Sequence, residues 1–184
     1  MKTHYIAALA VAVIAFCALS ACTSPPAQGS PTTGIEVNFQ PGGGATDAIV
    51  HELALAKRTI HVQAYSFTSA PIAQALVDAK RRGVDVEAVL DKSNKTEKYS
   101  AATFLVNAGI PTYIDAKHAI AHSKNIIVDG SLVMTGSFNF TKAAEEKNAE
   151  TSLILRGYPD VAKKFEANFA LHKSHSTPYQ RPSG

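Results

Sequence analysis

The chain has 184 residues, of which 46% are hydrophobic and 18% are charged, and its formal net charge is +3 with a pI of about 8.8. This length suits one globular domain with its own core, and the near-balanced charge excludes an acidic disordered chain and a histone-like polycation. A mildly basic chain permits nucleic acid or anionic lipid as a partner without requiring either. Because the two cysteines are Cys17 and Cys22, the rest of the chain cannot form a zinc ribbon, a cysteine redox site or a disulfide framework.

Residues 1–22 have the pattern of a secretory signal peptide. Lys2 precedes an apolar run over residues 6–19, and small residues follow it. The sequence Leu-Ser-Ala-Cys that ends at Cys22 resembles the bacterial lipobox, in which the cysteine thiol carries a lipid anchor, and ordinary cleavage nearby is the alternative. Thr23 stands where an aspartate retains lipoproteins in the inner membrane, so this resemblance implies the outer membrane. We therefore expect an exported protein that is periplasmic or anchored in the outer membrane.

Composition divides the remaining chain into a tether, a domain and a tail. Residues 23–33 are rich in Pro, Ser and Thr and predict a flexible linker, and residues 176–184 predict a disordered tail. The folded domain is expected over residues 34–175.

Within the domain, strand and helix patterns alternate. The expected strands span residues 35–39, 59–66, 84–90, 111–114, 124–128, 132–135 and 151–155, and the expected helices span residues 45–57, 70–82, 95–108 and 159–172. This order predicts an α/β layered sandwich in which helices flank a mixed β-sheet.

His51 and His61 have no partners at metal-ligand spacing. His61 shares the polar face of its strand with Gln63 and Tyr65, and these three residues are candidates for substrate binding. His172 and His175 are expected to be residues of the C-terminal tail.

The segment 121–139 concentrates polar residues around two apolar strands. His122 and Lys124 are two apart, so their side chains fall on one face of the sheet, and Ser137 and Asn139 repeat this spacing after the second strand. An antiparallel hairpin could bring the two pairs together. Asp129 has an odd offset from Lys124, which places it on the opposite face or in the turn. Taken alone, these residues also fit a solvated His and Lys at a strand end.

The spacing of these residues resembles the HKD signature of the phospholipase D superfamily. The match consists of His122-x-Lys124, then Asp129, then Gly136-Ser137-x-Asn139. Residues 65–68, 83–86 and 90–91 resemble the sequence that usually precedes the HKD motif in the superfamily. The similarity runs from about residue 35 to residue 169. In detail the chain resembles the small secreted bacterial endonucleases of EDTA-resistant type, which implies a phospholipase D-like fold with one HKD motif per chain.

The resemblance also implies a role for each residue of the motif. His122 would attack phosphorus and form a covalent phosphohistidine, while Lys124 and Asn139 would bind the phosphoryl oxygens. Ser137 would position these groups through a hydrogen bond, and Glu150 best matches the downstream carboxylate that orients the histidine. Asp129 is implied to be structural.

A single motif is half of the two-motif site of the superfamily, so we expect a symmetric homodimer in which His122 of the partner subunit is the general acid. The sequence contains no carboxylate cluster suited to a metal pair, so no cofactor is expected and activity should survive EDTA. The expected substrate is single- or double-stranded DNA, or RNA, with little sequence preference. The alternatives are a phospholipase D or phosphatidyl transferase that acts on lipid headgroups, and a non-catalytic envelope binding protein.

Overall fold

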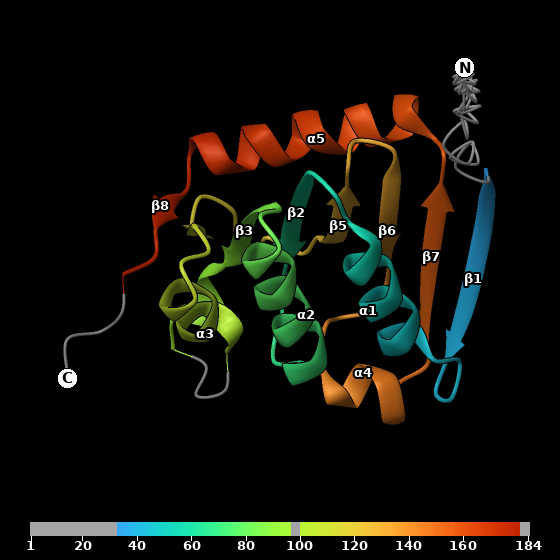
Figure 1. Ribbon diagram of the computed structural model, residues 1–184. Coiled ribbons are helices and arrows are strands. Elements are labelled where there is room, and N and C mark those ends of the chain that lie inside the picture. Colours follow the sequence, from blue (N-terminus) through green and yellow to red (C-terminus); the bar gives the residue numbers. More distant parts are fainter. Residues whose placement is uncertain (1–32, 97–99, 181–184) are drawn as a thin grey trace, which may run out of the picture. The chain divides into compact units, whose positions relative to one another are not determined.

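The computed structural model describes residues 33–96 and 100–180, so the predicted signal peptide, the lipobox and nearly all of the linker lie outside the described residues. Eight strands form one mixed sheet in the order β1-β7-β6-β5-β2-β3-β4-β8 (Figure 1). The strands are β1 (Gly34–Gln40), β2 (Thr59–Ala64), β3 (Asp85–Asp91), β4 (Thr112–Asp115), β5 (Lys124–Val128), β6 (Leu132–Gly136), β7 (Glu150–Arg156) and β8 (Thr177–Pro178). The β2–β3 and β3–β4 pairs are parallel and the other pairs are antiparallel.

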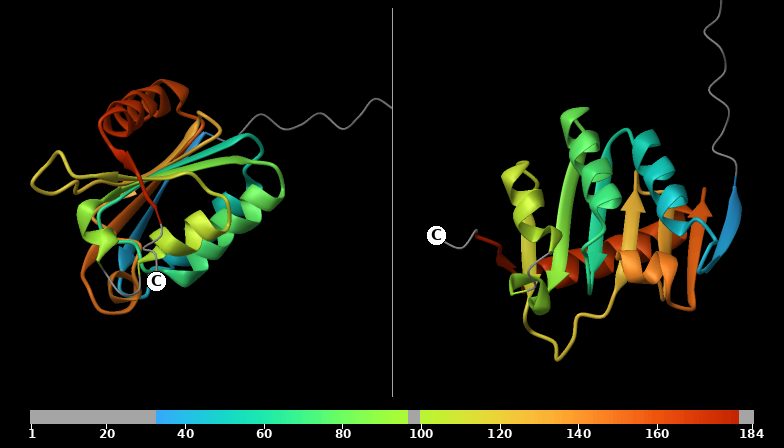
Figure 2. Two further views of the ribbon diagram at one scale, coloured as in Figure 1. Left: turned by 90° about the vertical axis from the view of Figure 1, so that its left-hand side faces the viewer. Right: turned by 90° about the horizontal axis from the view of Figure 1, so that it is seen from below.

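Helices cover both faces of this sheet, which confirms the predicted α/β sandwich. The helices are α1 (Ala45–Leu55), α2 (Ala70–Arg81), the 3-10 turn η1 (Lys92–Lys95), α3 (Ala101–Asn107), α4 (Lys142–Glu146) and α5 (Pro159–Ser174). Helices α1, α2 and α3 lie on one face, and α5 crosses the other face (Figure 2). Within the described ranges, no helix is both long enough and apolar enough to cross a bilayer.

Two apolar cores result from the alternation of side chains along the strands. In β5, Ile126 packs into the large core beneath α1–α3, whereas its neighbour Ile127 packs into a small core beneath α5. Val133 and Phe169 complete that smaller core from β6 and α5. Strand β5 is thus buried on both faces, and it carries the motif residue Lys124 at its first position.

The structure differs from the sequence-based elements in three places. The helix predicted over residues 95–108 is shorter, since η1 precedes it and Ser100 caps α3 through its side chain. Helix α4 was not predicted, because five residues are too few to show a helical period. The domain also extends past residue 175: β8 pairs with β4, and Tyr179 is buried with its hydroxyl 2.8 Å from Thr103 Oγ1.

Candidate active site

The register of three neighbouring strands gathers the motif at one end of the sheet. Strands β5 and β6 pair with Ile126 opposite Met134, and β6 and β7 pair with Gly136 opposite Ser152. The beginning of β5, the end of β6 and the beginning of β7 therefore meet (Figure 1). A cavity of about 470 Å³ lies there, lined by His122, Lys124, Gly136, Ser137, Asn139 and Glu150.

Gly136 allows β6 and β7 to approach closely beside this cavity. Its φ of +142° lies in a region that favours glycine, and a Cβ atom would collide with the carbonyl oxygen of Thr151. The backbone N–H of Ser137 donates to that carbonyl oxygen at 3.0 Å, and the N–H of Thr151 donates back to Ser137 Oγ at 3.0 Å. The glycine of the motif thus positions the serine that follows it.

Lys124 carries a buried positive charge into the cavity. The residue is only 5% exposed, and its Nζ donates one hydrogen bond, to the carbonyl oxygen of His122 at 2.7 Å. Its ammonium lies 5.1 Å from the centre of the Tyr65 ring, and no carboxylate of the described residues comes within ion-pair distance of it. Burial lowers the pKa of Lys124, and the negative charge of Glu150 opposes this shift only in part. Two of the three ammonium protons remain available to an anionic ligand.

The His122 ring lies exposed at the mouth of the cavity. It packs against Tyr65 with ring centres 4.7 Å apart and planes tilted by 54°. The backbone N–H of Tyr65 donates to the carbonyl oxygen of Ser123 at 2.9 Å, which ties the end of β2 to the segment that carries His122. Tyr65, predicted to bind substrate, therefore lies beside the reacting groups.

Glu150 is held by two residues that belong to the same end of the sheet. Ser137 Oγ donates to Glu150 Oε2 at 2.5 Å, and Asn148 Nδ2 donates to Glu150 Oε1 at 3.1 Å. No hydrogen bond joins Glu150 to the His122 ring among the described residues, so the predicted role of Glu150 in orienting that histidine has no direct contact in this structure. Asn148 was missed by the sequence analysis, because an Asn outside the motif gives no signal of its own.

Asn139 offers its side-chain amide to the same cavity. Its Oδ1 is buried and makes no hydrogen bond within the part of the chain that the structure describes. Buried polar atoms normally have partners, so this unpaired acceptor suits a ligand or water that donates to it, while the Nδ2 of the same amide is the group that can donate to an anion.

Asp129 lies at the opposite end of β5, in the turn before β6. Its carboxylate accepts hydrogen bonds from the backbone N–H groups of Lys57, Arg58 and Thr59 at 2.7–3.0 Å. Burial favours the neutral acid, but these backbone donors outweigh it and keep the pKa of Asp129 below its ordinary value. Asp129 thus ties the β5–β6 turn to the start of β2 and takes no part in lining the cavity.

His61 and Gln63 do not join the cavity, although both were predicted to bind substrate. His61 Nδ1 lies 2.6 Å from Glu166 Oε2 and its ring stacks on Phe169, while Gln63 Oε1 accepts a hydrogen bond from Asn168 Nδ2 at 3.2 Å. All three partners belong to α5. The polar face of β2 is therefore covered by a helix, which the alternation of the strand could not reveal.

Comparison with known proteins agrees with this geometry. The family model described as "Cardiolipin synthase, PLD-like domain" matches residues 49–173. The phospholipase D of Rickettsia typhi is 39% identical over 139 residues, which cover 76% of this chain and 68% of that protein. The mitochondrial cardiolipin hydrolase of Xenopus laevis is 32% identical over 110 residues, covering 60% of this chain and 52% of that protein.

Comparison with solved structures indicates the same family. Nuc from Salmonella typhimurium, described as a phospholipase D family member, is 39% identical with a TM-score of 0.78, and the match covers 83% of this chain and 100% of that one. NucT from Helicobacter pylori, at 22% identity and a TM-score of 0.73, shares the fold. The fold and the site define a phosphodiester-cleaving enzyme. The chain belongs to the phospholipase D superfamily, with one HKD motif.

Proposed function

We propose that the protein is an endonuclease that hydrolyses phosphodiester bonds of DNA, with RNA as a second substrate, without a metal ion in the reaction. The observation that carries this proposal is the composition of the cavity: its lining side chains are all polar, and no carboxylate in the described part of the chain lies within ion-pair distance of its buried ammonium. Such a site binds an anionic phosphodiester, and its exposed His122 is accessible to an extended polymer.

Each residue of the cavity has a place in the proposed reaction. His122 Nε2 attacks phosphorus, so a nitrogen–phosphorus bond forms while the bond from phosphorus to the leaving oxygen breaks. The Lys124 ammonium and the Asn139 amide donate to the non-bridging oxygens, whose charge grows in the transition state. Water then attacks the phosphohistidine and regenerates the free imidazole.

The leaving oxygen needs a proton in the first step, and the attacking imidazole cannot supply it. We therefore propose that His122 of the partner subunit donates that proton and afterwards accepts one from the attacking water. This requires a dimer in which two copies of the cavity face each other across a two-fold axis.

An apolar stripe on the edge strand β1 suits this dimer. Ile35, Val37 and Phe39, which we call the β1 patch, are 58%, 45% and 68% exposed. Gln40 is paired with Glu150, so the Phe39 end of the patch adjoins the end of the sheet where the cavity opens. A second copy that covers this patch would bury apolar surface next to the site, and we propose it as the dimer interface.

The second candidate function is hydrolysis of phospholipid headgroups, because the relatives from Rickettsia are named phospholipase D. The same residues would act on the headgroup phosphodiester. Acyl chains would need apolar surface beside the reacting groups. A cavity of about 520 Å³ between α2 and α3 contains apolar side chains such as Phe104, but it shares no lining residue with the cavity at His122.

The deciding experiment offers both substrates to EDTA-treated protein. Supercoiled plasmid and phosphatidylcholine vesicles are incubated with wild type, His122→Ala and the control His51→Ala, whose histidine is exposed on α1. The assay temperature lies well below the melting temperature measured in the same buffer. We expect plasmid cleavage by wild type and the control, and a loss of roughly 10³-fold or more in His122→Ala. Headgroup release with intact plasmid would establish the lipid function, and inactivity on both would indicate a binding protein.

The dimer is tested separately by sedimentation. The double variant Val37→Asp/Phe39→Asp should be a folded monomer with strongly reduced cleavage, whereas Leu55→Asp, which changes an exposed leucine on α1, should remain a dimer. Mixing wild type with excess His122→Ala should lower activity further than dilution does. A fully active monomer would refute the shared site.

A further inference from the structure

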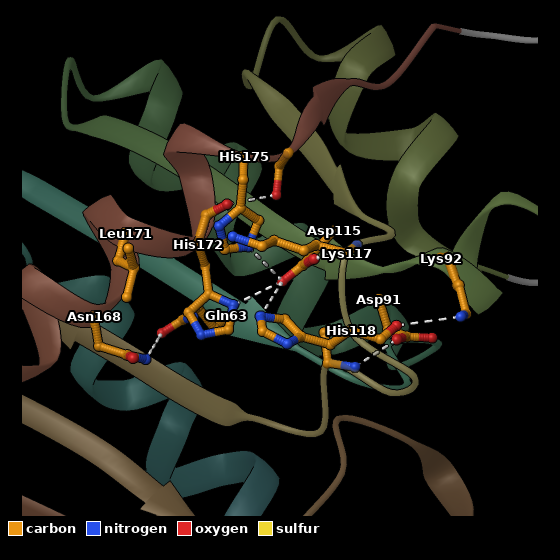
Figure 3. A network of polar contacts seen from close by, with 12 residues as sticks. Gln63, Asp91, Lys92, Asp115, Lys117, His118, Asn168, Leu171, His172 and His175 are labelled. Carbon is orange, nitrogen blue, oxygen red and sulfur yellow. Dashed lines mark hydrogen bonds and ion pairs between the residues drawn. The ribbon is translucent and has the colours of Figure 1, made fainter.

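Four side chains from distant parts of the sequence converge at the other end of α5. Asp115 ends β4, His118 lies in the loop that follows, His172 is in the last turn of α5, and His175 is the C-cap of that helix. One ligand atom from each of them lies within 4.8 Å of the others. Figure 3 shows the three imidazoles directed at the Asp115 carboxylate. His172 and His175 were expected to be residues of the C-terminal tail, but they lie at the end of α5 and pack into this cluster.

Asp115 is the centre of the cluster and is completely buried. Its Oδ1 accepts a hydrogen bond from the backbone N–H of Lys117 at 3.0 Å, so its Oδ2 faces the histidines. The cluster therefore presents one carboxylate oxygen and three imidazole nitrogens.

Hydrogen bonding alone does not account for this arrangement. Oδ2 lies 2.7 Å from His172 Nδ1 and 3.3 Å from His175 Nε2, but 3.9 Å from His118 Nε2, which is too far for a hydrogen bond. The third imidazole is nonetheless packed against the other two, with ring centres 5.0 and 5.3 Å away. The Asp115 carboxylate thus bonds two of its three imidazole neighbours, and the third lies beside it without a hydrogen bond to it.

The distances from the Asp115 carboxylate oxygen suit a four-coordinate metal ion, and the four ligand atoms all lie within 4.8 Å of one another. A tetrahedral Zn²⁺ with ligand bonds of about 2.0–2.1 Å separates its ligand atoms by about 3.3 Å. The three distances from Asp115 Oδ2 to the histidine nitrogens are 2.7, 3.3 and 3.9 Å, so they centre on this value. Nitrogen and oxygen donors of this kind suit Zn²⁺, and the hydrogen bond from Lys117 to Oδ1 is the outer-shell contact that orients a ligating carboxylate.

We propose that Asp115, His118, His172 and His175 form a structural zinc site, separate from the active site. None of the four lines the cavity at His122, so the ion would take no part in bond cleavage. It would instead fasten the end of α5 to β4 and to the loop that leads into β5. That loop carries His122 four residues after His118, so the zinc site would limit the motion of the catalytic histidine.

The site is tested with the full chain, first stripped by EDTA and dialysed, then titrated with Zn²⁺ alone. We expect binding of one ion by the cluster, and a rise in melting temperature of about 5–10 °C when free zinc is 100-fold above its dissociation constant. Co²⁺ in the same site should give the intense visible absorption of tetrahedral coordination.

Two variants keep the test independent of folding. His118→Ala removes a ligand that is 45% exposed and makes no hydrogen bond to Asp115, so it should fold normally and bind zinc at least about tenfold more weakly. His172→Ala/His175→Ala should abolish the bound ion, and His51→Ala should bind as wild type does. All three retain Cys17 and Cys22, so zinc held by those thiols would persist in every variant. Equal zinc binding by wild type and both cluster variants, or no rise in melting temperature, would overturn the proposal.

Discussion

Replacing Lys124 by Met should separate stability from activity. The substitution keeps the unbranched shape of the side chain, shortens it by one heavy atom and removes the buried ammonium. It gives up one hydrogen bond from a charged donor to the His122 carbonyl, about 1.5–3 kcal/mol, but it also removes a desolvation penalty of several kcal/mol that the charge of Glu150 offsets only in part. We expect Lys124→Met to be more stable than wild type by about 1 kcal/mol, which raises the melting temperature by about 2–4 °C.

The same substitution should nearly abolish catalysis. Removing one preorganised donor from developing transition-state charge costs about 10²–10³ in kcat. The assay is plasmid cleavage beside urea unfolding, with Lys163→Met, an exposed lysine on α5, as the control for loss of one positive charge.

The difference in stability between wild type and Lys124→Met should change with pH in a predictable direction. Burial lowers the pKa of Lys124 in the folded state, so the unfolded chain binds the extra proton between that pKa and the ordinary value of 10.5. Wild-type stability therefore gains from this group as pH rises through that window. The advantage of Lys124→Met should shrink accordingly. A variant that is less stable than wild type at neutral pH, with an unchanged difference at alkaline pH, would refute the reasoning.

Three further substitutions test the supporting contacts. Asp129→Asn neutralises a carboxylate that accepts hydrogen bonds from three backbone N–H groups, so the free energy of unfolding in urea should fall by about 2 kcal/mol while plasmid cleavage is unchanged. In wild type, this contribution to stability should be lost as the pH falls below about 4 and through the lowered pKa of Asp129. Arg156→Met leaves the buried Glu52 unpaired and should cost about 3 kcal/mol, which Arg156→Met/Glu52→Leu should largely recover. Ser137→Ala removes the hydrogen bond to Glu150 and should lower kcat roughly tenfold without loss of folding, measured by plasmid cleavage. The role of Asp129 would be contradicted if Asp129→Asn were as stable as wild type. The roles of Arg156 and Ser137 would be contradicted if the double variant did not recover stability, or if Ser137→Ala kept full activity.

Local patterns were sufficient to predict much of this site. The two-residue spacing of His122 and Lys124, and its repetition at Ser137 and Asn139, indicated one face of a hairpin, and all four line the cavity. The odd offset of Asp129 correctly separated it from them. These inferences succeed because strand alternation is a property of neighbouring residues and needs no knowledge of distant packing.

Other features depend on which surfaces meet. His61 and Gln63 looked like an open polar face, but α5 covers them through Glu166 and Asn168, more than 100 residues away in sequence. Glu150 was matched to the carboxylate that orients the histidine, yet its hydrogen bonds run to Ser137 and Asn148. The sequence pattern of one strand does not indicate which helix or strand packs on it.

The sequence by itself determined the family and the residues of the HKD motif through spacing along one short segment, and it determined the mixed α/β sandwich through the order of local strand and helix patterns. Only the tertiary structure brought Asp115 and His118 to His172 and His175. Each residue of the first pair is 54 to 60 positions away from each residue of the second. Helix α5 has to cross the sheet before its last turn reaches the end of β4. His172 and His175, which sequence patterns assigned to the C-terminal tail, thereby become two of the four ligands of the proposed zinc site.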